Sequence, residues 1–320
     1  MKLRFSILLS AAVLLLSGCV ALVETRVNMH RNKTFLECDY KGIIEEKVEY
    51  AEGLHYDLFL PQDLRSPKAR KLMLYVHGGS WTGGSRDEGG NWCRHYAYMG
   101  YTAATMDYSL QKGGKKPSID RMIDDMHACV AHIVKKLSAW DVTLDKMGLH
   151  GFSAGATLVM LYGYREAATS ELPVSFMIQM SGPVTFEPDA WKSEVHRYVD
   201  YVLGLDGSSK GDAKFLARMS GQLVTPAMVE YGSHKAVWES ISPICHIKAE
   251  SAPLLMAYGE TDGVVPRSHK RMLMEALDSA GAAYDYVGYP ESGHAPIYDP
   301  ECQKRFIALA DEYCSKYFSH

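Results

Sequence analysis

Short apolar runs alternate with segments of helical periodicity along most of this chain. Runs rich in Leu, Met, Val, Ile and Tyr predict strands at 71–76, 101–108, 174–182 and 253–259. In several of the segments between and after these runs, apolar residues recur at the spacing of an amphipathic helix. Strands that alternate with helices favour a mostly parallel sheet covered by helices on both faces, which places the chain in the α/β class.

The clearest helix is expected over 118–139. Ser118 follows Pro117 and suits the N-cap, and Asp120 lies in the first turn, where the helix dipole favours negative charge. The apolar face comprises Ile119, Met122, Ile123, Met126, Val130, Ile133, Val134 and Leu137. Further strands are expected at 43–50, 54–61, 146–152 and 284–290, and further helices at 156–164, 269–281 and 302–318.

The segment 186–240 interrupts this alternation. It contains helical pieces around 191–205 and 212–220, and we expect a cap-like insertion over the top of the sheet. Its larger apolar side chains either line a pocket for an apolar or aromatic group or pack the insertion onto the domain, and the sequence leaves both interpretations open. These side chains are Trp191, Tyr198, Tyr201, Leu203, Phe215 and Met219.

The first residues have the pattern of a secretory signal. Lys2 and Arg4 begin an apolar stretch over 5–16 that is short for a membrane-spanning helix. The sequence Leu-Ser-Gly-Cys that ends at Cys19 resembles the lipobox of bacterial lipoproteins, which implies cleavage before Cys19 and its lipidation. An ordinary signal peptide with a chance cysteine is the alternative.

These features predict the organisation of the chain. We expect a lipoprotein signal peptide over 1–18, a tether over 19–40 and an α/β domain over 41–320 that includes the insertion at 186–240. Acyl chains on Cys19 would hold the domain on a membrane of the bacterial cell envelope, facing the periplasm or the cell surface.

The composition limits the classes of function. Of the 320 residues, 47% are hydrophobic and 22% charged, which is ordinary for a globular protein with a sizeable core. The formal net charge of −4 and the absence of a Lys/Arg block argue against a nucleic-acid partner. The sequence contains neither CxxC nor HExxH, so we expect no metal and no cofactor.

The stretch 151–155, Gly-Phe-Ser-Ala-Gly, fits G-x-S-x-G between a predicted strand and a predicted helix. In that context the motif indicates a nucleophile elbow, a sharp turn that exposes the hydroxyl of Ser153. The glycines leave room for close approach of the backbone, and the helix N-terminus favours the negative charge that develops during reaction. Taken alone, the motif is equally consistent with a glycine-rich turn that has no chemistry.

A second motif, YVHGGSWTGGS at 75–85, follows the apolar run at 71–76. With it the chain resembles the α/β-hydrolase superfamily, in particular HGGG-type and feruloyl-esterase-like esterases, over roughly residues 45–318. The resemblance implies an oxyanion hole made by the backbone amides of Gly79, Ser80 and Ala154. Ser80 departs from the third glycine of the family motif but keeps an amide donor. For His77 we expect a structural role in this loop.

The resemblance also implies a base and an acid in the chain order Ser, acid, His. Asp262 follows the apolar run at 253–259, and His294 lies in a glycine-containing loop after the last predicted strand. Glu260 competes with Asp262 as the acid, but Asp262 matches the family position. The expected catalytic triad is therefore Ser153, Asp262 and His294.

The expected activity is hydrolysis of carboxylic esters of short acyl, acetyl or feruloyl type through an acyl-enzyme. The ester substrate is a small molecule or is linked to a polysaccharide. One alternative is a serine peptidase that cuts amide bonds, although related peptidases often carry a large additional domain such as a propeller. The other is a binding protein without catalysis, displayed on the cell surface. The sequence leaves the oligomeric state open.

Overall fold

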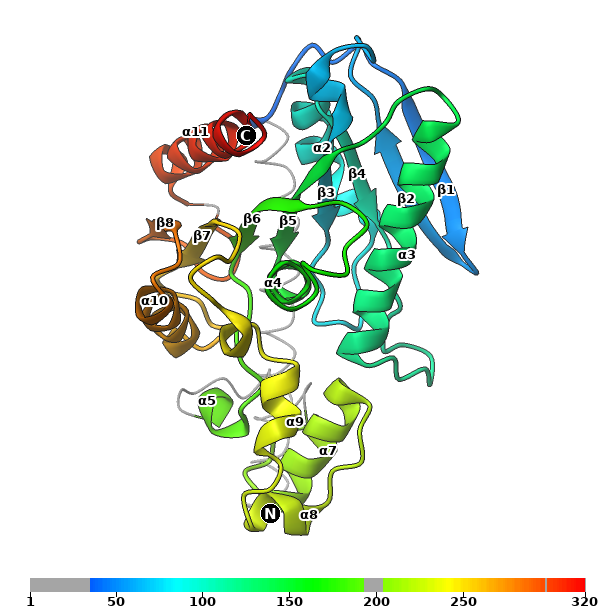
Figure 1. Cartoon of the computed structure of the whole chain (residues 1–320). Coiled ribbons are helices and arrows are strands. Elements are labelled where there is room, and N and C mark those ends of the chain that lie inside the picture. Colours follow the sequence, from blue (N-terminus) through cyan, green and yellow to red (C-terminus); the bar gives the residue numbers. More distant parts are fainter. Residues whose placement is uncertain (1–34, 193–203, 297, 320) are drawn as a thin grey trace, which may run out of the picture.

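We describe residues 35–192, 204–296 and 298–319 of a computed structural model of the chain (Figure 1). An eight-stranded sheet has the order β1-β2-β4-β3-β5-β6-β7-β8. Its strands are β1 (Ile44–Ala51), β2 (Leu54–Phe59), β3 (Lys71–Val76), β4 (Thr102–Met106), β5 (Lys146–Phe152), β6 (Val174–Met180), β7 (Leu254–Gly259) and β8 (Tyr284–Tyr289). The β1–β2 and β2–β4 pairs are antiparallel and the other pairs are parallel, so the predicted mostly parallel sheet is confirmed.

Helices cover both faces of this sheet. They are α2 (Gly90–Tyr98), α3 (Ile119–Ser138), α4 (Ala154–Arg165), α5 (Pro188–Lys192), α7 (Ser209–Ser220), α8 (Pro226–Glu230), α9 (Lys235–Ser240), α10 (Ser268–Ala280) and α11 (Pro300–Tyr317). Buried side chains of α3, α4 and α10 form one core with the sheet, and those of α2 and α11 form a second core on the other face. Short 3₁₀ helices occur at Pro67–Arg70, Arg86–Gly89 and Pro243–His246.

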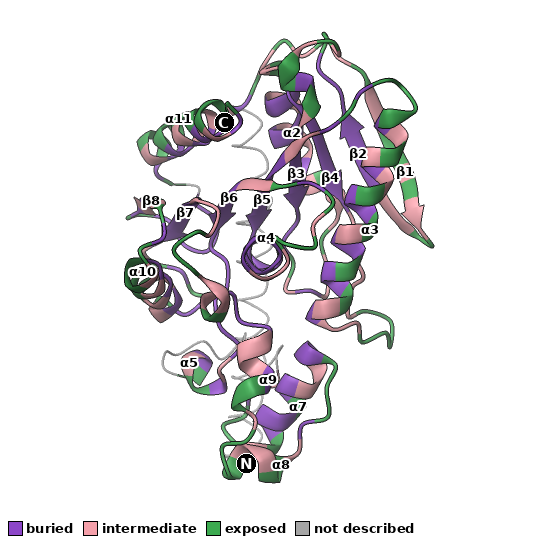
Figure 2. Cartoon of the chain, in the orientation of Figure 1, coloured by how far each residue is buried: buried purple, intermediate pink, exposed green. Residues whose placement is uncertain are grey.

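Strand β3 shows why the central strands are continuous apolar runs. Leu72, Leu74 and Val76 enter the core beneath α3 and α4. Met73 and Tyr75 enter the core beneath α2 and α11. Successive side chains of a strand point to opposite faces, so a strand covered on both sides needs apolar residues at every position. Figure 2 shows the same continuous burial along the central strands.

The helix predicted over 118–139 is α3. The Oγ of Ser118 accepts a hydrogen bond from the amide of Arg121 (3.2 Å), which is the predicted N-cap. Sequence analysis missed α2, whose buried residues Trp92, Cys93, Tyr96 and Ala97 also follow helical spacing. This helix has only nine residues, and aromatic and cysteine side chains have low helix propensity. Burial against the sheet therefore stabilises it.

Most of the segment 186–240 lies beyond the carboxyl ends of the strands as the short helices α5, α7, α8 and α9 (Figure 1). Trp191, Phe215 and Met219 are buried in the core that includes α3 and α4. Phe186 joins this layer to the sheet side by contacting both Trp81 and Phe215. Trp191, Phe215 and Met219 therefore pack the segment onto the domain. The other three side chains that the sequence singled out, Tyr198, Tyr201 and Leu203, lie outside the described residues.

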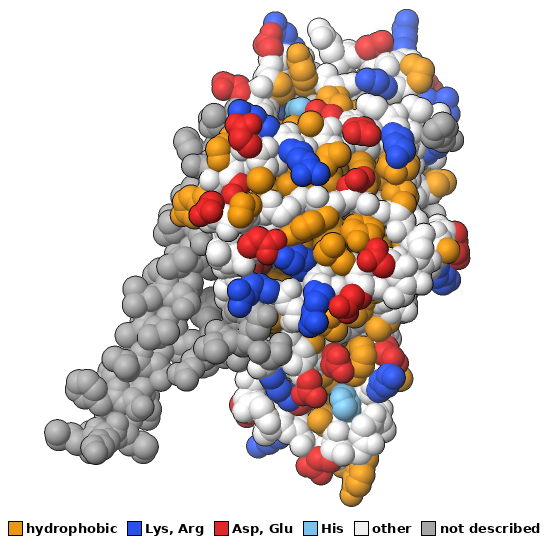
Figure 3. Space-filling view, turned by 90° about the vertical axis from the view of Figure 1, so that its left-hand side faces the viewer, with side chains coloured by type: hydrophobic (Ala, Val, Ile, Leu, Met, Phe, Trp, Pro, Cys, Tyr) orange, Lys and Arg blue, Asp and Glu red, His pale blue; other side chains and the backbone are white. Residues whose placement is uncertain are grey.

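The face seen in Figure 3 carries acidic and basic side chains mixed with apolar ones, and neither sign of charge forms a continuous field there. The part of the chain that the structure describes has no helix long and apolar enough to cross a membrane. The predicted signal peptide, the predicted lipidation site Cys19 and most of the predicted tether lie outside the described residues.

Candidate active site

Ser153 lies on a tight turn between β5 and α4. Its backbone has φ 52° and ψ −119°, a conformation that costs about 1–3 kcal/mol for a residue with a side chain. The turn is held by the Ser153 amide, which donates to the carbonyl oxygen of Met180 on the neighbouring strand (2.8 Å). The strained turn keeps the hydroxyl at the carboxyl edge of the sheet.

The two glycines of the motif allow α4 to approach the sheet closely. A Cβ atom at Gly155 would lie 2.1 Å from the carbonyl oxygen of Val76, and one at Gly151 would lie 2.5 Å from the carbonyl oxygen of Gly155. Both distances are well inside van der Waals contact, so neither position accepts a larger residue without movement of the backbone. The glycines are thus explained by packing around the turn.

The structure brings Ser153, His294 and Asp262 together. The Nε2 atom of His294 lies 2.8 Å from the Oγ of Ser153, and its Nδ1 atom lies 2.9 Å from the Oδ2 of Asp262. All three side chains are buried, with exposed fractions between 4% and 7%. With its proton on Nδ1, His294 donates to the carboxylate and presents Nε2 as the acceptor for the serine hydroxyl.

Asp262 is fixed from behind by the backbone. Its Oδ1 atom accepts hydrogen bonds from the amides of Val264 (2.8 Å) and Val265 (3.0 Å). These bonds fix the orientation of the carboxylate and leave Oδ2 for His294. The competing acid, Glu260, instead binds Lys270 (2.5 Å) and the hydroxyl of Tyr286 (2.7 Å). The structure therefore places Asp262, and not Glu260, against the histidine.

The loop that begins at His77 lies against the serine. A Cβ atom at Gly78 would lie 3.2 Å from the Cβ of Ser153. Gly79 has φ 109° and Ser80 has φ 52°, so the chain coils back, and the Gly79 carbonyl accepts from the amides of Thr82 and Gly83 (3.0 Å each). Among the described residues, no group accepts a hydrogen bond from the amides of Gly79 and Ser80.

The third predicted donor, the amide of Ala154, belongs to the first turn of α4. Amides in the first turn of a helix have no acceptor within the helix, and they point toward the positive end of its dipole. The structure therefore places a helix amide beside the hydroxyl of Ser153, next to the loop that carries Gly79 and Ser80. Such an arrangement can stabilise an oxygen anion.

The side chain of His77 packs against the backbone of this loop. It is fully buried, its Nδ1 atom lies 2.7 Å from the carbonyl oxygen of Gly78, and its ring stacks on Tyr108 at 4.3 Å. Burial lowers the pKa of His77 to about 4, so the ring is neutral near pH 7. This environment agrees with the structural role expected from the sequence.

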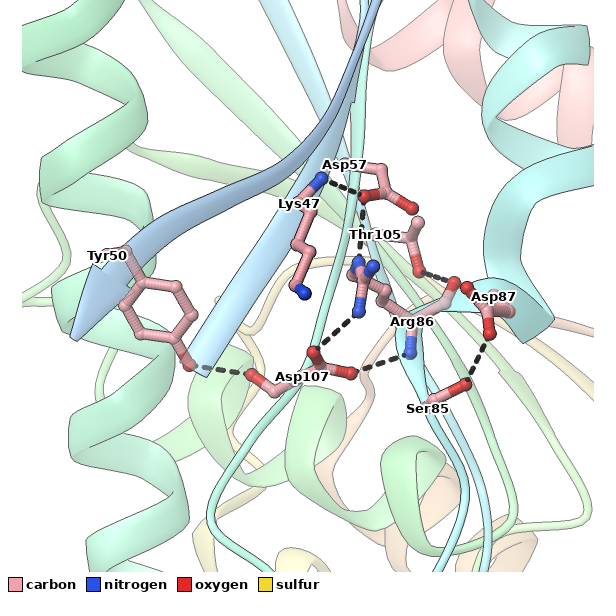
Figure 4. Close-up of polar contacts among 8 residues, drawn as sticks. All are labelled: Lys47, Tyr50, Asp57, Ser85, Arg86, Asp87, Thr105 and Asp107. Atoms are coloured by element: carbon pink, nitrogen blue, oxygen red, sulfur yellow. Dashed lines mark hydrogen bonds and ion pairs between the residues drawn. The ribbon is translucent and has the colours of Figure 1, made fainter. Parts of the chain in front are cut away.

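Arg86 anchors the far end of the same loop to three strands (Figure 4). Its guanidinium binds Asp57 on β2 (2.7 Å) and Asp107 after β4 (3.0 Å), and its carbonyl accepts from Thr105 (2.7 Å). Asp57 also accepts from the amide of Lys47 on β1 (2.7 Å). Sequence analysis did not single out Arg86, because its partners are distant in the chain.

A second set of residues that sequence analysis missed connects the loop that carries Asp262 with the loop that carries His294. Thr261, next to Asp262, donates its hydroxyl to the carbonyl of Ser292 (2.8 Å). The hydroxyl of Ser292 donates to Asp299 (2.5 Å), which also accepts from the amide of Glu291 (3.1 Å). Asp299 precedes α11 at its N-cap position but makes no capping hydrogen bond with its side chain. Its carboxylate instead holds the loop that carries the histidine.

No group of three or more His, Cys, Asp or Glu side chains is arranged to hold a metal ion within the described part of the chain. The six described cysteines, from Cys38 to Cys314, are all unpaired thiols. Burial raises the pKa of the thiols of Cys93, Cys129 and Cys314, which keeps them protonated. Their burial is that of core residues.

The chain is similar to known hydrolases. Esterase LipC from Mycobacterium tuberculosis is 27% identical over 247 residues, which cover 71% of this chain and 53% of LipC. Dipeptidyl aminopeptidase BIII from Pseudoxanthomonas mexicana is 23% identical over 255 residues, which cover 77% of this chain and 33% of the peptidase. This chain thus spans about half the length of LipC and a third of the peptidase.

The fold is similar to that of solved esterases. The structure of a truncated carbohydrate esterase from gut microbiota superposes with a TM-score of 0.59 at 18% identity, over 87% of this chain and 98% of that one. A model of the BD-FAE family matches residues 56–277, which is more than half of the 320 residues. The resemblance to α/β-hydrolase esterases is thereby confirmed, and the chain belongs to the BD-FAE family.

Proposed function

We propose that this chain hydrolyses carboxylic esters, with Ser153 as nucleophile, His294 as base and Asp262 as the acid that orients the base. The observation that carries the proposal is the continuous hydrogen-bonded relay from Asp262 through His294 to Ser153. The relay lies beside amides of Gly79 and Ser80 that bind no described group. Membership of an esterase family gives independent support.

The reaction follows from the arrangement. Ser153 attacks the ester carbonyl while Nε2 of His294 takes its proton, and Asp262 stabilises the imidazolium that forms. The amides of Gly79, Ser80 and Ala154 bind the oxyanion of the tetrahedral intermediate. His294 then protonates the leaving alcohol, and the serine remains acylated. Water, deprotonated by His294, releases the acid and restores the free hydroxyl.

The substrate class we propose is a short acyl, acetyl or feruloyl ester, either of a small alcohol or of a polysaccharide. LipC is an esterase, and the truncated gut protein is a carbohydrate esterase, which supports this choice. Activity on 4-nitrophenyl acetate and release of acetate or ferulate from sugar esters would test it. Absence of turnover across a panel of such esters would refute the proposal.

Ser153→Ala tests the nucleophile directly. We expect the variant to lose ester hydrolysis by a factor of about 10⁶ and to lose labelling by a fluorophosphonate probe. The matched control is Ser251→Ala, which changes a half-buried serine in the segment before β7. If Ser153→Ala turned over every ester as the unaltered protein does, the protein would be non-catalytic at this site or would use another nucleophile.

The similarity to dipeptidyl aminopeptidase BIII makes amide hydrolysis the second candidate. An ester and an amide pass through tetrahedral intermediates of the same kind, but the amine leaving group of an amide needs more complete protonation than an alcohol. Aminoacyl 4-nitroanilides distinguish the two candidates. Cleavage of these anilides at a rate comparable with that of esters would favour the peptidase.

We also propose that Cys19 is lipidated and holds the domain on a membrane of the bacterial cell envelope. The basis is the short apolar stretch that ends at Leu-Ser-Gly-Cys. Fractionation of cells that express the full chain should place the protein with membranes, and Cys19→Ala should release it or retain the uncleaved precursor. Recovery of the unaltered protein in the soluble fraction would refute the anchor.

A further inference from the structure

A cavity of about 880 Å³ adjoins the loop that holds the proposed oxyanion donors. Its walls come from the β1–β2 turn, the segment 107–117 after β4 and the first turn of α3, and they include His77. The volume is typical of a site for a ligand as large as one or two sugar rings.

The wall formed by the segment 107–117 is basic. Lys112, Lys115 and Lys116 line the cavity and are exposed, and none of them is ion-paired with any residue in the described ranges. Arg121 also lines the cavity, but it binds the buried carboxylate of Asp125 (3.0 Å). Three ammonium groups are therefore directed to solvent around one hollow without a partner.

The acidic groups of the cavity do not cancel this charge. Asp107 is the only acid besides Glu52 among the described lining residues, and both oxygens of its carboxylate are bound by Arg86 (Figure 4). Glu52 is exposed on the β1–β2 turn and contributes one negative charge. The unpaired charges that line the cavity are thus three positive and one negative, which favours an anionic ligand.

The basic segment is joined to the active site. The backbone amide of Gln111, beside Lys112, donates to the carbonyl of Trp81 in the loop that begins at His77 (2.8 Å). At the near end of that loop, His77 lines the cavity and is followed by Gly78, which lies against Ser153. The cavity therefore adjoins, through His77, the loop that lies against Ser153.

We propose that this cavity is a subsite for a carboxylate-bearing, hydroxylated part of the ester substrate, such as a uronate sugar of a polysaccharide. The inference rests on the proposed ester hydrolysis and narrows its substrate class. The exposed ammonium groups suit a carboxylate, and the hydroxyl of Ser109 suits the hydroxyl groups of a sugar. An aliphatic acyl chain would desolvate the lysines without pairing their charges, so the cavity disfavours it.

The test compares two substrates that differ only in charge: acetylated galacturonate oligosaccharides and the same oligosaccharides with their carboxyl groups reduced to alcohols. Release of acetate gives kcat/KM for each. We expect the unaltered protein to prefer the acidic substrate by roughly tenfold, since three exposed charge pairs contribute modestly one by one. Raising the salt concentration to about 0.5 M should lower this preference, because exposed charges are screened.

The variant K112Q/K115Q/K116Q should bring the ratio of the two kcat/KM values to about one, and K112R/K115R/K116R should retain the preference. The matched control K135Q/K248Q/K304Q removes three exposed lysines elsewhere and should keep the ratio of the unaltered protein. Thermal unfolding of each variant checks that the fold is retained.

Three results would overturn the subsite: a ratio near one in the unaltered protein, a preference that survives the glutamine variant, or an equal loss in the control. Hydrolysis of 4-nitrophenyl acetate without release of acetate from either oligosaccharide would also overturn it while leaving the proposed function intact. Absence of hydrolysis of all esters would instead refute the proposed function.

Discussion

Asp262→Asn changes a single atom in the relay, and the structure determines how the new amide must lie. The amides of Val264 and Val265 both donate to Oδ1 of Asp262. An asparagine has only one acceptor atom, and that atom has to face these two donors, because an NH₂ group in its place would leave both amides unsatisfied. The NH₂ group of the asparagine therefore faces His294.

This orientation of the asparagine changes the tautomer of His294. Nδ1 of His294 lies 2.9 Å from the position that the NH₂ group would occupy, so it has to become an acceptor and the proton has to move to Nε2. Nε2 then carries a hydrogen toward Ser153 and cannot accept the hydroxyl proton. We expect kcat to fall by about 10⁴-fold, or about 5.5 kcal/mol of barrier, as for a triad with the wrong tautomer.

The assay is steady-state hydrolysis of 4-nitrophenyl acetate near pH 7, with the unfolding midpoint measured in parallel. Glu260→Gln is the matched control, because it removes a carboxylate two residues away that binds Lys270 and Tyr286 and does not contact His294. The control should lose less than about threefold in kcat, which corresponds to a small effect on the barrier. A loss below tenfold for Asp262→Asn would contradict the assigned relay.

Other consequences concern stability and loop position. Burial lowers the pKa of His77 to about 4 and that of His150 to about 3, from the usual 6.5, so below pH 6.5 the unfolded chain binds more protons than the folded protein. The midpoint of urea unfolding should therefore fall as the pH is lowered from 7 to 4, and His150→Gln should make this fall smaller. Gly155→Ala should destabilise the fold by about 2–3 kcal/mol, seen as a lower urea midpoint, because its Cβ would lie 2.1 Å from the Val76 carbonyl. Asp299→Ala should lower kcat by about 10–100-fold with little change in KM, by analogy with the loss of groups that support a functional residue. An unchanged kcat would show that Asp299 does not position His294.

The sequence predicts the strands and the main helices because each depends on local pattern, whereas Asp262 and His294 are implied by the resemblance to the hydrolase family. β3 and β5 are expected at the observed residues, and β3 has the continuous apolar run of a strand covered on both faces. The turn at Ser153 is equally local, because the two glycines that permit it lie within the same five residues. The residues that position these groups cannot be found in this way. Arg86 is an ordinary charged residue until the sheet brings Asp57 to it, and Asp299 is one until the loop that carries His294 folds back onto the start of α11.

The same reasoning explains why the basic cavity was not foreseen. Lys112, Lys115 and Lys116 lie in a glycine-containing segment that reads as a solvated loop. Their significance comes from the antiparallel turn of β1 and β2, which supplies the opposite wall, and from Arg86, which neutralises Asp107 within it. Chain order gives no indication of either, because residues 51–54 meet residues 107–117 only through the pairing of β2 with β4. The proposed subsite would give an activity on a common hydrolase sheet its substrate preference through loop contacts that sheet topology creates. Charge substitutions there should change specificity without changing the chemistry proposed for Ser153.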